Sequence, residues 1–263
     1  MSRPNKTIEG LAAQFGIKKP DDWKNVLPDS IIAKPKIGPK ALDALRLWLA
    51  DQGLTLRDDR TPAYWQQMLT AREGESRPLA CPFIVLIDSQ EKHPFTFTGF
   101  RAGAAMDNRP LDVTTQIKSL GPSHGDYSVR GYEGQIHIER KSLDDAHNTF
   151  LGWGEHRERF EHTLQFLDSI EFGAMVIECT YGTMLSTAPS RGRKSSEENK
   201  LILNQQYYAW LLKYRSVKWI FCDSRRLAEV STFRLFEKFY AYKLRQKKAA
   251  EKKSAEHAEF ATL

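Results

Sequence analysis

Three charged residues in one segment could act together on a phosphodiester. Asp126 follows Gly125, and a later Glu-Arg-Lys triplet contains Glu139 and Lys141. Alternate side chains of a β-strand face the same side of a sheet, so a strand over 136–141 would place Glu139 and Lys141 together. Two carboxylates and an ammonium can hold a hard divalent cation and support phosphodiester hydrolysis. This combination predicts hydrolytic chemistry on a nucleic acid.

A hairpin would have to bring Asp126 close to Glu139. Gly131 and Gly134 suit a turn between the strand that carries Asp126 and the strand over 136–141. Taken alone, a Gly-Asp pair is an ordinary turn signal and a charged strand end is common, so the neighbouring segments must decide the interpretation.

Two flanking segments add acidic residues. The apolar run 82–87 is typical of a buried central strand, and it ends at Asp88, with Glu91 shortly after. Downstream, Ser142 is a predicted helix cap. Asp145 in the first turn of that helix suits the positive end of the helix dipole, or else faces the same cleft as the other acids.

Together these residues resemble the XPF-type nuclease domain, a branch of the PD-(D/E)XK nuclease superfamily. The pattern of that family is an apolar strand ending in Asp-x-Arg-Glu, then Gly-Asp, then Glu-Arg-Lys followed after three residues by Asp. The matching positions are Asp88, Glu91, Gly125, Asp126, Glu139, Arg140, Lys141 and Asp145. Gln90 stands where the family has arginine, which leaves the local charge balance open.

The resemblance implies an α/β fold over residues 81–245, with a restriction-endonuclease-like mixed central sheet flanked by helices. It also implies a Mg²⁺-dependent endonuclease, with Mn²⁺ as a substitute, that cuts flapped, forked or branched DNA in repair or recombination. The expected metal ligands are Asp88, Asp126 and Glu139, for one ion or two. The expected catalytic set is Asp88, Glu91, Asp126, Glu139, Arg140, Lys141 and Asp145.

Two residues of the triplet have different expected roles. Lys141 would position the nucleophile or neutralise the scissile phosphate. Arg140, on the opposite face of an ideal strand, would pair with a neighbouring acid and orient the site.

Two alternatives remain beside a DNA endonuclease. One is a nuclease-fold subunit that has lost catalysis and binds DNA or a protein partner as a scaffold. The other is RNA cleavage. The retention of every acid of the pattern, and of Lys141, favours the enzyme over the scaffold. A homodimer is an open possibility.

Residues 1–71 form a predicted small all-α domain. Pro39 suits the first position of a helix, apolar residues recur with helical spacing, and Gly53 suits its end. The segment resembles a helix-hairpin-helix element and the C-terminal domain of the bacterial RNA polymerase alpha subunit, both of which grip a DNA backbone. The expected DNA contacts are Lys36, Gly38 and Lys40, although Lys36 replaces the first glycine of the usual hairpin. A purely structural helical domain is the alternative.

The remaining segments complete the predicted organisation. Residues 72–80 form a polar linker, and residues 246–263 form a basic C-terminal tail. A basic loop over 188–196 either contacts DNA or is a plain surface loop, and its candidate contacts are Arg191, Arg193 and Lys194.

Composition agrees with a nucleic-acid partner. The net charge is +6 with a pI near 9.1, which favours a polyanion. No apolar run reaches the roughly 18 residues of a membrane span, and no secretory signal is present. Cys81, Cys179 and Cys222 lack zinc-site spacing and do not form a disulfide framework. We therefore expect a cytoplasmic protein, associated with the nucleoid or of phage or bacterial intracellular origin, without a membrane partner.

Overall fold

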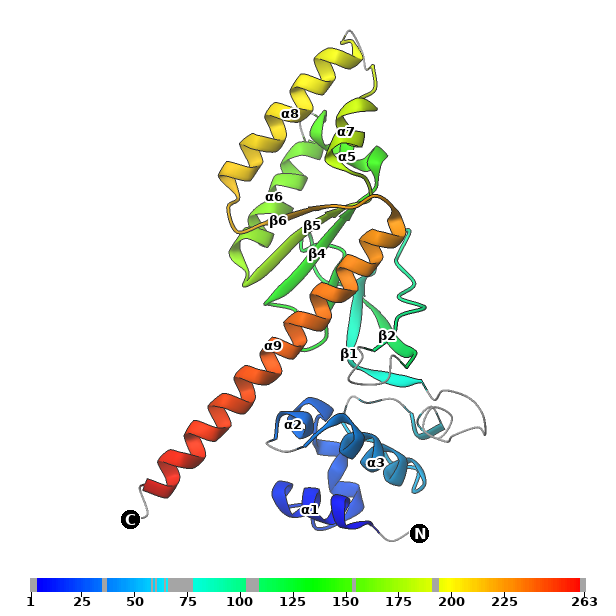
Figure 1. The fold of residues 1–263 in the computed structure, drawn as a ribbon, viewed down its shortest axis with the longest axis vertical. Coiled ribbons are helices and arrows are strands. Elements are labelled where there is room, and N and C mark those ends of the chain that lie inside the picture. The colour runs from blue at the N-terminus through cyan, green and yellow to red at the C-terminus, as the bar shows by residue number, and fades with distance from the viewer. Residues whose placement is uncertain are drawn as a thin grey trace. The chain divides into compact units, whose positions relative to one another are not determined.

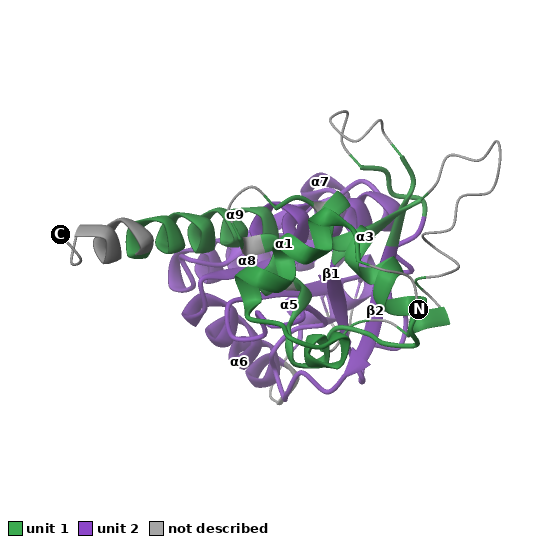
Figure 2. Cartoon of the chain, turned by 90° about the horizontal axis from the view of Figure 1, so that it is seen from below, with its two compact units in different colours: residues 1–82, 99–112, 240–263 green, residues 83–98, 113–239 purple. Residues whose placement is uncertain are grey.

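The computed structural model describes residues 4–34, 37–57, 59, 61–63, 65, 78–102, 109–152, 155–190 and 194–260. The chain divides into two compact units, coloured separately in Figure 2. One comprises residues 1–82, 99–112 and 240–263, and the other comprises residues 83–98 and 113–239. The domain boundaries expected from the sequence stay predictions.

Within the described part of the chain, the strands form one six-stranded mixed sheet with the order β2-β1-β3-β4-β5-β6 (Figure 1). Their bounds are β1 Leu79–Asp88, β2 Leu111–Lys118, β3 Tyr127–Val129, β4 Ile136–Lys141, β5 Phe172–Ile177 and β6 Lys218–Phe221. β3 is antiparallel to both β1 and β4, whereas β5 is parallel to both β4 and β6. Five of the six residues of β4 are buried, as expected for a strand covered on both faces.

The predicted hairpin is confirmed. β3 pairs with β4 so that Tyr127 lies opposite Ile138. Gly131 in the turn has a φ of 81°, a left-handed conformation that glycine adopts without strain. This register places Asp126, directly before β3, beside the end of β4 that carries Glu139.

Helices cover both faces of the sheet in this unit. On one face lie α5 (Leu143–Phe150), α6 (Glu155–Ser169), α7 (Tyr181–Ser186) and α8 (Ser196–Lys213), which share a core with β5. On the other face lies the first part of α9 (Arg225–Phe260), where Phe233 stacks on Phe83 of β1 with 5.8 Å between ring centroids. The predicted fold class, a mixed sheet flanked by helices, is confirmed.

The N-terminal residues form helices only, within their described part. These are α1 (Lys6–Phe15), the 3₁₀ helix η1 (Pro20–Asn25), α2 (Pro28–Ala33) and α3 (Pro39–Ala50). α3 begins at Pro39 as predicted, with Gly38 as its N-cap. Its apolar face is fully buried among the helices through Leu42, Leu45 and Leu49. No helix in the described part of the chain is long and apolar enough to cross a lipid bilayer.

Candidate functional site

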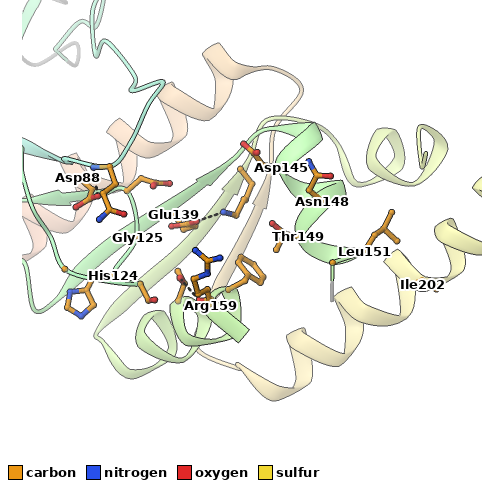
Figure 3. Close-up of a pocket in the computed structure, with 18 of the residues that line it drawn as sticks. Asp88, His124, Gly125, Glu139, Asp145, Asn148, Thr149, Leu151, Arg159 and Ile202 are labelled. Atoms are coloured by element: carbon orange, nitrogen blue, oxygen red, sulfur yellow. Dashed lines mark hydrogen bonds and ion pairs between the residues drawn. The ribbon is translucent and has the colours of Figure 1, made fainter. Parts of the chain in front are cut away.

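A cavity of about 1110 Å³ opens in the unit that contains the centre of the sheet. Five of the seven predicted catalytic residues line it, namely Asp88, Asp126, Glu139, Lys141 and Asp145 (Figure 3). They come from the end of β1, the start of β3, the end of β4 and the start of α5. The fold therefore gathers acids that are far apart in the sequence around one space.

Asp126 is fixed by the backbone of β4. Its N–H donates to the Ile138 carbonyl at 2.9 Å, and its Oδ2 accepts from the Arg140 N–H at 2.7 Å. Gly125 before it has a φ of 91°, and a Cβ there would lie 3.3 Å from the Ile138 carbonyl carbon. Burial raises the pKa of Asp126 well above its ordinary value, and the nearby Glu139 carboxylate raises it further.

Lys141 and Glu139 form an ion pair on the same face of β4. Lys141 Nζ lies 2.6 Å from Glu139 Oε1 and 5.4 Å from the centroid of the Phe160 ring. Burial lowers the pKa of Lys141, but the carboxylates of Glu139, Asp126 and Asp145 together outweigh this effect, so the pKa is raised overall. The lysine is thus an ammonium ion at neutral pH, suited to balancing negative charge and not to accepting a proton.

Asp88 and Asp145 line the cavity while also stabilising local backbone. Asp88 Oδ1 accepts from the Leu120 N–H and its Oδ2 from the Gln90 N–H, each at 2.8 Å. Asp145 donates its N–H to Ser142 Oγ at 3.1 Å, so the predicted helix cap is confirmed. Both carboxylates keep lone pairs for a further partner, because each oxygen can accept more than one hydrogen bond.

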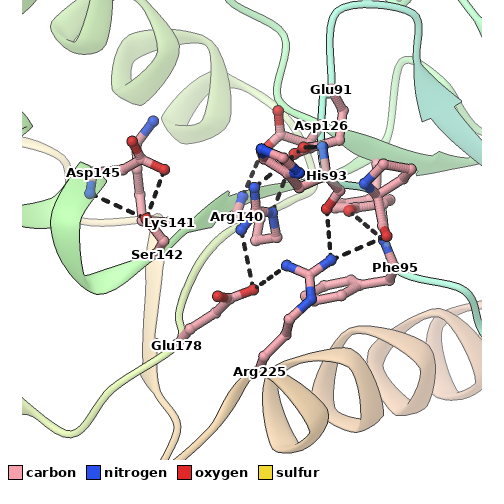
Figure 4. A network of polar contacts seen from close by, with 12 residues as sticks. Glu91, His93, Phe95, Asp126, Arg140, Lys141, Ser142, Asp145, Glu178 and Arg225 are labelled. Atoms are coloured by element: carbon pink, nitrogen blue, oxygen red, sulfur yellow. Dashed lines mark hydrogen bonds and ion pairs between the residues drawn. The ribbon is translucent and has the colours of Figure 1, made fainter.

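Glu91 and Arg140 lie apart from the cavity, on the other face of β4 (Figure 4). Arg140 Nε and Nη2 bind the two oxygens of Glu91, both at 3.1 Å, and Nη1 binds Glu178 at 3.0 Å. Arg225 from α9 also contacts Glu178, at 2.8 Å. The expected pairing of Arg140 with a neighbouring acid is present, and the predicted catalytic set is divided between two faces of the sheet.

The donors in the cavity suit one class of metal ion. Among the described residues, no three His, Cys, Asp or Glu side chains are grouped so that they could hold a metal ion. Asp126 and Glu139 instead form a carboxylate pair whose repulsion a cation would relieve. Mg²⁺ is commonly held by one or two carboxylates and several waters, whereas structural zinc needs a closed set of ligands. The residues therefore fit Mg²⁺ or Mn²⁺.

Helices α5, α6 and α8 form a wall of the cavity that no sequence motif indicates. Arg159, Phe160 and Thr163 of α6 line the cavity, as do Asn148 and Thr149 of α5 and Asn199 of α8. In the sequence, Phe160, Leu164 and Leu167 recur at helical spacing, which indicates a buried helix face. Which of the neighbouring residues face the cavity depends on how α6 lies on the sheet.

The predicted DNA contacts are distributed over the chain. Lys194 lines the cavity, whereas Arg191, Arg193 and Lys36 lie outside the described residues. Gly38 is the N-cap of α3 without a side-chain cap, and Lys40 is exposed in the first turn of that helix.

No protein-family model matches the chain, and no curated protein matches it. Among solved structures, the chain is similar to XPF from Aeropyrum pernix in complex with DNA, with a TM-score of 0.39 and 15% sequence identity. The similarity covers 62% of this chain and 66% of that one, slightly less than two thirds of its length. The fold class itself therefore rests on the sheet and helices described above.

Proposed function

We propose that this chain is a metal-dependent endonuclease that hydrolyses DNA phosphodiester bonds. The observation that carries the proposal is the convergence of Asp126, Glu139 and Lys141 in one cavity, with Asp88 and Asp145 on its lining. Two buried carboxylates beside one ammonium leave a negative charge uncompensated, and its burial is unfavourable unless a cation binds or Asp126 takes up a proton. The same arrangement suits a divalent ion and a phosphate.

The chemistry divides among the residues as follows. A bound Mg²⁺ or Mn²⁺ would supply an activated water and would stabilise negative charge on the phosphate. Asp126 and Glu139 would hold this ion through carboxylate oxygens and waters. Asp88, the third expected ligand, lines the cavity but is not grouped with them as a direct ligand, so it would act on the ion through a bound water. Lys141 would balance charge on the scissile phosphate once the ion shares the Glu139 carboxylate.

The predicted site residues outside the cavity would either position the catalytic acids or bind DNA. Glu91 and Arg140 would hold β4, and with it Asp126, in place. Gly38 and Lys40 would contact the DNA backbone through the uncapped start of α3, a position that favours phosphates. Lys194 would contact DNA at the cavity, together with Arg191 and Arg193. We also propose that the enzyme prefers flapped, forked or branched DNA to plain duplex DNA.

A cleavage assay tests the function. Labelled duplex, flap, fork and four-way-junction DNAs are incubated with Mg²⁺, Mn²⁺, Ca²⁺ or a chelator, using wild type, Asp126→Asn and Lys141→Ala. We expect metal-dependent cutting by wild type and a loss of at least about 10²-fold in both variants, with DNA binding retained. Asp144→Asn is the matched control, because Asp144 is exposed in the same region and does not line the cavity.

The outcomes separate the enzyme from a scaffold. Equal cutting by wild type and both variants would remove the assignment of the site. Tight DNA binding by wild type, without cutting under any metal, would support the catalytically inactive subunit instead. An RNA substrate of the same shape distinguishes DNA cleavage from RNA cleavage.

A further inference from the structure

One arginine projects into the cavity from the wall opposite the acids. Arg159 is an exposed residue of α6, and Figure 3 shows its side chain rising from that helix into the cavity, towards Glu139. Among the described residues, no hydrogen bond or ion pair holds its guanidinium. Its backbone carbonyl accepts a bond from Thr163 Oγ1. The guanidinium is therefore available to a ligand.

A second arginine on the same helix, Arg157, has a structural role and serves as a comparison for Arg159. Arg157 donates from Nε to Glu161 Oε1 at 3.2 Å, and its guanidinium lies 5.9 Å from the centroid of the Trp210 ring. It lies outside the lining of the large cavity. Two residues apart, α6 holds one arginine with protein partners and directs the other into the cavity.

The charges of the cavity call for such a group. Its lining contains four carboxylates, from Asp88, Asp126, Glu139 and Asp145. Lys141 is already paired with one of them, so a phosphodiester that approaches the acids meets repulsion that the metal and the other cations of the lining must offset. A planar guanidinium presents two parallel N–H donors to two phosphate oxygens, whereas an ammonium acts as a point charge without this fixed geometry.

The size of the cavity agrees with a substrate segment. About 1110 Å³ exceeds the usual range of roughly 300–1000 Å³ for small-molecule pockets. The space can therefore take part of a nucleotide strand in addition to a hydrated ion.

We propose that Arg159 binds the non-bridging oxygens of the phosphodiester that enters the cavity, across from the acids. This inference rests on the proposed function and adds a substrate contact to it. Arg159 would be one of the residues that hold the cut strand, and it supplies positive charge from α6 while Lys141 supplies it from β4.

The test measures binding separately from cleavage. A fluorescein-labelled flap DNA is titrated with protein in Ca²⁺ at several salt concentrations, for wild type, Arg159→Ala, Arg159→Lys and Arg157→Ala. Each phosphate contact contributes about 0.7–0.9 to the slope of log K against log salt. We expect Arg159→Ala to lower that slope by about this amount, with affinity about 10-fold weaker. Arg159→Lys should keep the slope, because its charge is retained, and Arg157→Ala should match wild type.

A kinetic measurement in Mg²⁺ completes the test. We expect KM to rise in Arg159→Ala and to stay unchanged in Arg157→Ala. If wild type cuts DNA but Arg159→Ala keeps its salt slope and KM, the inference fails while the proposed function stands. If Arg159→Ala loses the slope although Asp126→Asn and Lys141→Ala do not affect cutting, the phosphate contact stands while the proposed catalytic site fails. A wild-type protein that binds no DNA overturns both.

Discussion

Asp126 accepts a hydrogen bond of 2.7 Å from the backbone N–H of Arg140, whose side chain binds Glu91 on the opposite face of β4. Arg140 thus holds an acid of the cavity through its backbone and the buried ion network through its guanidinium. The side chain and the backbone N–H of Arg140 make these contacts in different directions from one strand position. A shift of the Arg140 side chain within the network therefore also moves the backbone N–H that binds Asp126. The network can affect the acids of the cavity without touching a substrate.

We predict that Arg140→Met strongly destabilises the fold. The side chains of Glu91 and Glu178 are 5% and 11% exposed. Removing Arg140 takes the guanidinium away from buried Glu91 and leaves Glu178 paired with Arg225. Breaking a buried ion pair in this way typically costs about 3–5 kcal/mol. Urea unfolding measures the change in the free energy of unfolding.

Arg225→Met is the control for this change. Its side chain is 44% exposed, and Glu178 would keep Arg140 as a partner. The Arg225 guanidinium also donates to the carbonyl oxygens of His93 and Pro94, so we expect a loss of about 1–2 kcal/mol, still below that of Arg140→Met. Equal losses in the free energy of unfolding for Arg140→Met and Arg225→Met would mean that burial of the ion network does not determine its contribution to stability.

We predict that Asp126→Asn stabilises the metal-free protein at neutral pH. Its pKa is raised in the folded state by burial and by Glu139. A group with a raised folded pKa supports folding at low pH, and that support is lost as the pH rises through the folded pKa. Above the ordinary aspartate pKa, the folded protein must therefore either take up a proton at Asp126 or hold an unfavourable charge there, and the amide removes this cost. Thermal unfolding in chelator should show a higher Tm for the variant.

Metal addition reverses the order in that experiment. Ca²⁺ or Mg²⁺ should raise the Tm of wild type, because ligands that bind only the folded state stabilise it, and it should have little effect on Asp126→Asn. Asp144→Asn should behave as wild type in both conditions. A lower Tm for Asp126→Asn in chelator would show that the acid is stabilised by partners other than a metal.

The pH dependence of cleavage should reflect the same acid. An ion must displace the proton of Asp126, so apparent Mg²⁺ affinity should fall as the pH drops through the raised pKa. The acid limb of the rate profile should therefore lie well above about pH 3.9, the ordinary aspartate value. Rates measured at several Mg²⁺ concentrations check this, since more Mg²⁺ should move the limb to lower pH. A limb near the ordinary value, independent of Mg²⁺, would contradict the prediction.

The sequence predicted those parts of the site that depend on local rules. Strand alternation placed Glu139 and Lys141 on one face, and the turn glycines placed Asp126 beside them. It did not predict Arg159 or Arg225, because their positions depend on how α6 and α9 pack against the sheet. The motif also did not reveal that Glu91 would face away from the cavity. The chain turns after Asp88, and the backbone N–H groups of Leu120 and Gln90, which donate to the Asp88 carboxylate, set the direction of that turn.

Gly125→Ala should test whether the backbone before Asp126 sets the geometry of the site. Gly125 has a φ of 91°, and an added Cβ would lie 3.3 Å from the carbonyl carbon and oxygen of Ile138. The left-handed conformation costs about 1–3 kcal/mol for a residue other than glycine, and the contact pushes the loop away from β4. Because Asp126 follows directly, we expect at least about 10-fold slower cleavage together with this loss in the free energy of unfolding. Gly134→Ala is the control, since a Cβ there meets no atom within 4 Å, and it should leave both quantities near wild type. Slow cleavage by Gly125→Ala at wild-type stability would mean that the loop contacts the substrate itself.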